Sequence, residues 1–120
     1  MDTSKPKISV DYVDGLTVIR FTDEKILEEV DILALQGSVM SVIESREKLK
    51  LILDFCNVEF LSSAVLGLLL RISKKVYENE GQLRLCCISP KIYEVFKITR
   101  LTNIFEIHDS LELAKESLVE

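Results

Sequence analysis

The chain has 120 residues, 48% of them hydrophobic, and residues 1–120 are expected to form a single domain with one ordinary core. Its formal net charge is −5 and its 15 lysines and arginines are dispersed, which argues against direct nucleic-acid binding and favours protein partners. The N-terminal residues 1–10 contain no apolar core typical of a signal peptide, and the longest apolar run, residues 64–70, is too short to span a bilayer, so we expect a cytoplasmic protein that does not enter the membrane.

The first third of the chain predicts a β-hairpin followed by a helix. Residues 7–13 and 16–21 alternate in polarity around an Asp-Gly pair, whose residues tolerate the positive φ of a tight turn. Apolar residues then recur at helical spacing from Ile32 to Ile43. A helix should therefore begin near the end of the acidic stretch 23–31.

The middle of the chain predicts a buried strand, a helix and a second strand. Residues 49–55 are apolar on both alternating faces, which is typical of a central strand covered on both sides. A helical stripe runs on from Ser62 and should fade before Gly81, which we interpret as its stop signal. Residues 82–88 form the next predicted strand.

The C-terminal third predicts a helix, a short strand and a last helix. Ser89-Pro90 is typical of an N-cap followed by proline at the first helical position. Residues 103–108 read as a strand, and Asp109 with Glu112 resembles a capping box that opens the last helix. The order β-β-α-β-α-β-α-β-α predicts an α/β domain, with a mixed sheet of about five strands and about four helices packed on it.

Several kinds of catalytic and cofactor site are not expected. His108 is the only histidine, and Cys56, Cys86 and Cys87 include no C-x-x-C pair, so we expect no metal site and interpret the thiols as small buried hydrophobes in a reducing cytoplasm. The four glycines never cluster into a phosphate-binding loop, and no G-x-S-x-G motif surrounds the serines. We therefore predict no cofactor and no enzymatic activity.

The chain's only adjacent serines, Ser62 and Ser63, lie where a central strand gives way to a helix. Helix capping, worth ~1 kcal/mol, would explain one serine. The following helix is apolar on nearly every face of its first two turns, whereas a helix that covers a sheet needs one apolar stripe. The surplus predicts an exposed apolar patch beside the serines, which is typical of a partner interface.

These residues carry a family resemblance. The segment "LKLILDFCNVEFLSSAVLGLLLRI", its β-β-α lead-in and the tail "ISPKIYEVFKITRLTNIFEIHDSLELA" resemble a STAS domain. More narrowly, the whole chain is similar to stand-alone bacterial anti-sigma factor antagonists. In that family a segment Asp-Ser-Ser/Ala-Gly-Leu-Gly contains a serine that a cognate anti-sigma factor kinase phosphorylates.

The resemblance implies positions for the site. Aligning the family's Leu-Gly with Leu66-Gly67 makes Ser63 the phosphoacceptor, with Ser62 as the alternative if the register shifts by one. Ser62 then stands in the place of the family's Asp, and Val65 in that of its first Gly. The implied partner-binding residues are Asn57, Glu59, Leu61, Ser62, Ser63, Ala64, Leu66 and Gly67.

The function implied by the resemblance is a partner switch. The unmodified protein would bind the anti-sigma factor kinase and free a sigma factor, phosphorylation would end this binding, and a serine phosphatase would reset it. Three alternatives stay open: a STAS scaffold that binds partners without phosphorylation, a STAS domain that binds a nucleotide or small ligand, and a structural domain whose serines are only caps.

Overall fold

A computed structural model describes residues 7–118, whose strands build one large and one small sheet. The large sheet has five strands in the order β1-β2-β4-β6-β7, with β1 antiparallel to β2 and every other pair parallel. These strands are β1 (Ile8–Val13), β2 (Leu16–Phe21), β4 (Lys50–Asp54), β6 (Gln82–Cys86) and β7 (Ile107–His108). The predicted mixed α/β sheet is confirmed.

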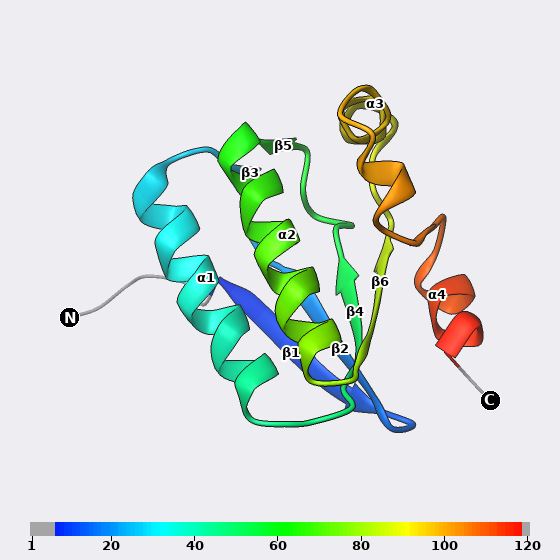
Figure 1. The fold of residues 1–120 in the computed structure, drawn as a ribbon. Coiled ribbons are helices and arrows are strands. Elements are labelled where there is room, and N and C mark those ends of the chain that lie inside the picture. The colour runs from blue at the N-terminus through cyan, green and yellow to red at the C-terminus, as the bar shows by residue number, and fades with distance from the viewer. Residues whose placement is uncertain (1–6, 119–120) are drawn as a thin grey trace.

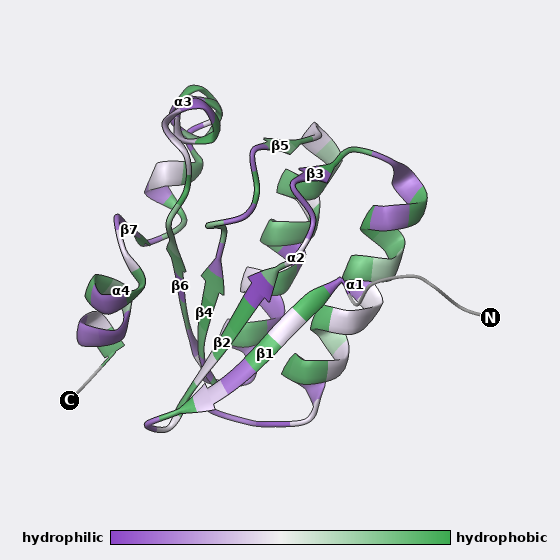
Figure 2. Cartoon of the chain, turned by 180° about the vertical axis from the view of Figure 1, so that it is seen from behind, coloured by the Kyte–Doolittle hydropathy of each residue, from purple (hydrophilic) through white to green (hydrophobic). Residues whose placement is uncertain are grey.

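Four α-helices among the described residues cover this sheet unevenly (Figure 1). Two long helices lie on one face, a short helix packs on the other, and the remaining helix lies beyond the carboxyl ends of the strands (Figures 1 and 2). In chain order they are α1 (Glu29–Glu44), α2 (Ser63–Glu78), α3 (Pro90–Ile98) and α4 (Leu111–Leu118). The long pair, α1 and α2, forms the larger core with the sheet, and α4 closes a smaller one.

The N-terminal hairpin follows from its turn. Val13 pairs with Leu16, so only two residues connect β1 to β2. Asp14 and Gly15 have φ values of 53° and 79°, the positive angles of the tight turns that match the twist of a hairpin. The prediction from the Asp-Gly pair is therefore confirmed.

Strand β4 is the central strand of the large sheet, lying between β2 and β6. Leu51 and Leu53 point into the core beneath α1 and α2, whereas Ile52 packs with Ala114 and Leu118 of α4. Burial of both faces explains why this segment is apolar at successive positions. The expectation that residues 49–55 form a central strand is confirmed.

The predicted extent of the last strand is mostly wrong. Residues 103–108 were expected to be extended, but only Ile107–His108 pair with β6, and a 3₁₀ helix, η1 (Leu101–Asn103), precedes them. The Phe105 amide donates to the Leu101 carbonyl over 2.9 Å, and its ring lies 6.1 Å from that of Phe96. Burying this aromatic ring beneath α3 requires a turn, which overrides the apolar pattern of a strand.

Two local signals at helix ends also differ from expectation. Helix α2 ends at Glu78, before Gly81 as predicted, but the left-handed residue that follows it is Glu80, with φ 61°, and not Gly81. A side chain at Gly81 would place its Cβ 2.5 Å from the Leu49 carbonyl oxygen, so glycine is needed there for a close backbone approach. At α4 the capping oxygen is Ser110 Oγ, which accepts from the Leu113 amide over 3.2 Å, rather than the predicted Asp109.

Candidate functional site

The serine pair is placed by a small second sheet that the sequence did not predict. Strands β3 (Lys25–Ile26) and β5 (Phe60–Leu61) pair in parallel. The Ser62 amide then donates to the Ile26 carbonyl over 3.0 Å. This pairing ties the chain before α2 to the chain before α1, so the two helices begin side by side (Figure 1) and the serines share a groove with Leu27 and Glu29.

The two serines have opposite environments. Ser62 occupies the N-cap position with an extended backbone, but its side chain caps no amide, and Oγ is buried without a hydrogen-bond partner among residues 7–118. Ser63 is the first residue of α2 and is exposed, as is Ala64 after it. The interpretation of one serine as a side-chain cap of α2 is therefore wrong, whereas Ser89 does cap α3 by accepting from the Ile92 amide over 3.3 Å.

A groove with a volume of about 590 Å³ runs between the N-terminal halves of α1 and α2. Both serines line it, together with polar and charged side chains of the two helices. Across the groove, the Arg71 guanidinium donates to Gln36 Oε1 over 2.9 Å, which links α2 to α1. The lining residues are Leu27, Glu29, Ile32, Leu33, Gln36, Ser62, Ser63, Ala64, Gly67 and Arg71.

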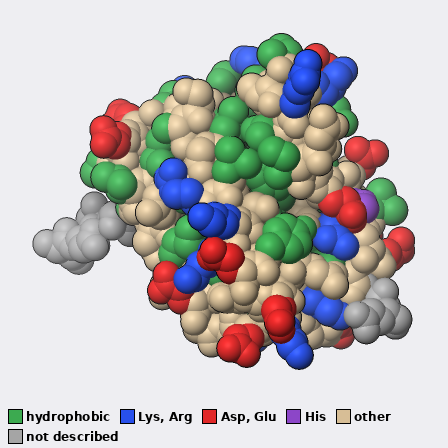
Figure 3. Space-filling view, in the orientation of Figure 1, with side chains coloured by type: hydrophobic (Ala, Val, Ile, Leu, Met, Phe, Trp, Pro, Cys, Tyr) green, Lys and Arg blue, Asp and Glu red, His purple; other side chains and the backbone are tan. Residues whose placement is uncertain are grey.

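The exposed apolar surface beside the serines comes from a different helix than expected. The leucines in the first turns of α2 are buried between the sheet and α1, and only Leu70 is exposed. Around the start of α1, however, Leu27, Val30 and Leu33 keep 51%, 67% and 59% of their surface exposed. Figure 3 shows hydrophobic side chains gathered in the upper half of the face that carries α2. Exposed apolar side chains therefore do lie near the serines, but those named come from the first turns of α1 and the segment before it and not from the first turns of α2.

Most of the predicted partner-binding residues lie at the surface. Asn57 and Glu59 are exposed in the loop after β4, and Leu61 is half-buried in β5. Leu66 is only 8% exposed and belongs to the core, so it supports α2 from below and offers no contact surface. Its position in the apolar stripe of α2 could have indicated this burial, because the stripe faces the sheet.

Phe60 is a surface residue that sequence reasoning missed. Its ring is 37% exposed and carries two lysine ammonium groups, Lys91 at 4.4 Å and Lys25 at 5.5 Å from the centroid. Next to it, a hydrogen bond with the Glu24 carboxyl raises the pKa of Glu59. The surface around the segment that leads into the serine pair therefore combines an aromatic ring, two cations and a carboxyl pair.

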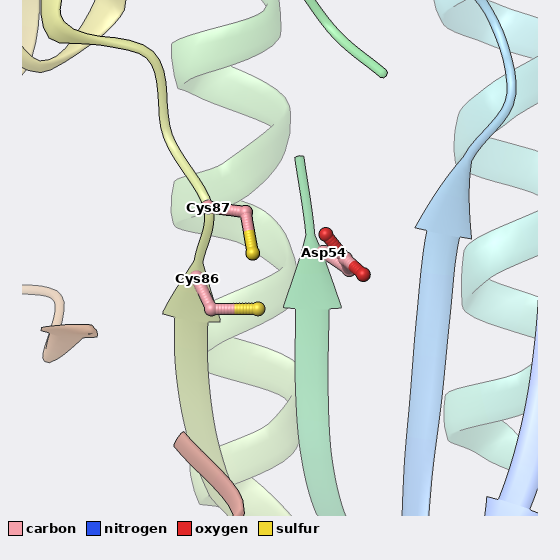
Figure 4. A group of neighbouring side chains, drawn as sticks. All are labelled: Asp54, Cys86 and Cys87. Carbon is pink, nitrogen blue, oxygen red and sulfur yellow. The ribbon is translucent and has the colours of Figure 1, made fainter. Parts of the chain in front are cut away.

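The carboxyl ends of β2, β4 and β6 hold a second group of polar side chains. Asp54 is 2% exposed, and its Oδ2 accepts from Arg20 Nε over 3.0 Å. Its Oδ1 accepts from the Cys56 amide over 2.9 Å. Cys86 and Cys87 lie beside the same carboxylate (Figure 4). The absence of a C-x-x-C pair therefore does not keep these side chains apart, because the fold brings Cys86 and Cys87 together with Asp54.

The thiols of this group are held in their neutral form. The expectation that all three cysteines are buried holds for Cys86 alone, since Cys87 is half-buried and Cys56 is exposed in the loop after β4. Desolvation nevertheless raises the pKa of each thiol, and the neighbouring Asp54 charge raises all three further. Neutral thiols are poor nucleophiles. This part of the molecule therefore does not present an activated catalytic cysteine.

His108 lies away from the serine site. Its Nε2 is 2.9 Å from Glu106 Oε2, and this contact lowers the pKa of the Glu106 carboxyl. Arg84 forms an ion pair with the same carboxylate and also donates to Ser117 Oγ over 3.0 Å. These contacts fasten α4 to the edge of the sheet, which is a structural role.

No helix within residues 7–118 combines the length and apolarity that a bilayer crossing would need.

Comparison with known proteins identifies the fold. BtrV of Bordetella bronchiseptica, named as a candidate anti-sigma factor antagonist, is 26% identical over 108 residues, which cover 90% of each chain. The solved anti-sigma factor antagonist (STAS) domain protein of Planctomyces limnophilus superposes with a TM-score of 0.82 at 24% identity, covering 89% of this chain and 93% of that one. The solved structure of the phosphorylated form of SpoIIAA, a Bacillus cell fate determinant, superposes with a TM-score of 0.69 at 18% identity, covering 93% of this chain and 99% of that one.

The STAS domain profile matches residues 7–114, which span most of the chain and include the hairpin, the serine pair and the start of α4. The resemblance noted in the sequence therefore rests on a match through the whole sheet and not on the serine segment alone. This chain belongs to the STAS domain family.

Proposed function

We propose that this protein is an anti-sigma factor antagonist that binds an anti-sigma factor kinase through the start of α2, and that phosphorylation of Ser63 ends this binding. The names of the similar proteins support the role. The observation that carries the choice of residue is the contrast between the two serines. A kinase can reach the exposed Ser63, whereas the Oγ of Ser62 is enclosed.

The position of Ser63 suits a charge switch. Phosphorylation adds about −1.5 to −2 charge at neutral pH. At the first residue of α2 this charge meets the positive end of the helix dipole, so the domain should stay folded. The exposed Leu27 and Leu33 line the same groove. A partner that covers these leucines would have to desolvate the phosphate beside them, and this cost would release it.

The proposed contact surface includes the serine loop and the start of α1. Asn57, Glu59, Ser63 and Ala64 are its exposed members from the predicted set. Leu27 and Leu33 add apolar area that the predicted set lacked, while the buried Leu66 is left out. The surface then has an apolar centre with a polar rim, which is the usual composition of a protein interface.

The proposed partners are an anti-sigma factor serine kinase and a serine phosphatase that resets the switch. In this proposal the protein works in the bacterial cytoplasm, where a sigma factor would be released to RNA polymerase. The kinase would supply the phosphoryl-transfer chemistry, and this chain would be its substrate with no catalytic role of its own. No cofactor is proposed for the switch.

Phosphorylation is tested by incubating the protein with ATP and candidate anti-sigma factor kinases encoded near its gene. Intact mass should show one added phosphate on the wild type and on Ser62→Ala, and none on Ser63→Ala. Phosphate that persists on Ser63→Ala and disappears from Ser62→Ala would assign the site to Ser62 and refute the argument from exposure.

Binding is tested with Ser63→Asp and its neutral, nearly isosteric control Ser63→Asn. Ser63→Asp should bind the kinase at least roughly tenfold more weakly than Ser63→Asn, because the carboxylate carries part of the phosphate's charge into an apolar contact. Equal binding by the two variants, together with no phosphorylation, would favour a passive scaffold. A nucleotide that binds in the groove without any kinase partner would favour the ligand-binding alternative.

A further inference from the structure

The three side chains Asp54, Cys86 and Cys87 converge at the carboxyl ends of two neighbouring strands. Asp54 of β4 is the register partner of Cys86 of β6, and Cys87 follows directly. One carboxylate oxygen and the two sulfurs all lie within 4.8 Å of one another. Figure 4 shows the Cys86 side chain directed toward Asp54, with the Cys87 sulfur on the same side of the strand, above the Cys86 sulfur. The three ligand atoms are therefore close enough together to contact a single ion.

The backbone of Cys87 makes this convergence possible. Side chains of successive residues in a strand point to opposite faces, so an adjacent pair of cysteines in β6 would normally diverge. Cys87 has φ 61°, a left-handed conformation that residues with a side chain rarely adopt. Its amide donates to the His108 carbonyl over 3.2 Å, which holds this conformation in place.

The carboxylate has room for a cation. Asp54 accepts from Arg20 on one oxygen and from the Cys56 amide on the other, and the Cys56 and Cys87 thiols also hydrogen-bond to this carboxylate. A cation that binds Cys87 as a thiolate would take the place of that thiol's proton at the carboxylate. The net charge also balances. Without a metal, the charges of Asp54 and Arg20 cancel each other. A divalent cation would in turn cancel the charges of the two thiolates that form when the thiol protons are released to the solvent. A buried site gains no uncompensated charge by this exchange.

We propose that Asp54, Cys86 and Cys87 bind a thiophilic divalent cation, for which Zn²⁺ has the preferred chemistry. Zinc accepts sulfur and carboxylate ligands together, and three protein ligands leave its fourth position open. Cys86 and Asp54 are almost completely buried, while Cys87 is half-buried and provides the access from solvent. This proposal departs from the expectation of no metal site, which was based on the single histidine and the absence of a C-x-x-C pair, and it does not depend on the proposed partner switch.

The test is titration of the reduced, untagged full chain with Zn²⁺ in competition with a chromophoric chelator, and with Co²⁺ as a spectroscopic probe. The wild type should bind one equivalent of Zn²⁺, and Co²⁺ should show a thiolate-to-metal charge-transfer band with the visible bands of a tetrahedral site. Cys87→Ser should weaken binding by roughly 10- to 100-fold or more, since even outer-shell changes cost that much.

Two variants serve as controls. Cys56→Ser removes an exposed thiol outside the ligand set, and His108→Ala removes the only imidazole; both should keep one equivalent and the same Co²⁺ spectrum. Binding lost in Cys56→Ser or His108→Ala but kept in Cys87→Ser would overturn the ligand set. A wild type that takes up no Zn²⁺, or a Co²⁺ complex without thiolate bands, would overturn the site itself. Thermal unfolding of each variant without metal confirms that it is folded.

Discussion

The Ser62→Ala variant should unfold at the wild-type temperature or a few degrees above it, although Ser62 stands at the N-cap of α2. Replacing a serine cap by alanine usually costs ~1 kcal/mol, because a hydrogen bond to a helix amide is lost. Ser62 makes no such bond, so this loss does not apply. Its Oγ is instead buried without a partner, a state that costs roughly 1–3 kcal/mol.

The expected shift can be worked out from the chain length. Removing the unpaired hydroxyl should raise the free energy of unfolding by up to ~1 kcal/mol, taking the low end of that range because alanine is itself a poor N-cap residue. An unfolding entropy of ~2.1 cal/mol/K per residue over 120 residues converts 1 kcal/mol into about 4 °C in Tm.

The assay is thermal and urea unfolding followed by far-ultraviolet circular dichroism, since the chain contains no tryptophan. Ser89→Ala is the matched control within the same protein, because Ser89 Oγ does accept from the Ile92 amide. Ser89→Ala should lower the free energy of unfolding by ~1 kcal/mol, whereas Ser62→Ala should not lower it. An equal loss in both variants would show that Ser62 caps α2 in solution and would refute the reasoning.

Three further predictions concern stability. Gly81→Ala should lower the free energy of unfolding, measured in urea, by at least ~1–3 kcal/mol, because the new Cβ would clash with a backbone carbonyl that cannot rotate away. A loss below ~1 kcal/mol would contradict this prediction. Arg20→Met should lower the free energy of unfolding by roughly 3–5 kcal/mol, because it leaves the buried Asp54 charge unpaired. Adding Asp54→Asn should recover much of this free energy, since the asparagine oxygen can still accept the hydrogen bond from the Cys56 amide. The His108 contact lowers the pKa of Glu106, so the carboxylate stabilises the fold at pH values above its pKa in the unfolded chain, and this contribution is lost as the pH falls through its pKa in the folded protein. Glu106→Gln should therefore reduce the loss of unfolding free energy on acidification by ~0.2–1 kcal/mol, and an unchanged pH profile would argue against the contact.

The sequence by itself determined the elements whose signals are local. The Asp14-Gly15 turn, the Ser89-Pro90 start of α3 and the two-sided apolar character of β4 each express a constraint on neighbouring residues, and the structure contains all three. A turn needs particular φ angles and a cap needs a hydroxyl at one position. Such requirements can be recognised without knowing what lies across the fold.

Tertiary structure decided the features that depend on partners distant in sequence. The β3–β5 pair joins segments more than thirty residues apart, and it determines that Ser62 is enclosed while Ser63 is exposed. The packing of α1 against α2 buries the leucines whose surplus had predicted a patch on α2. Sequence periodicity specifies which residues of a helix share a face, but the neighbouring helix determines how much of that face is covered.

The cysteines show the same division most clearly. Their spacing along the chain indicated three separate buried thiols, because no two of them match a ligand motif. Parallel pairing of β4 with β6 places Asp54 opposite Cys86, and the left-handed conformation of Cys87 keeps its sulfur within 4.8 Å of both partners' ligand atoms. Strand register and a single unusual φ angle are long-range and conformational properties, so this cluster exists only in the folded chain.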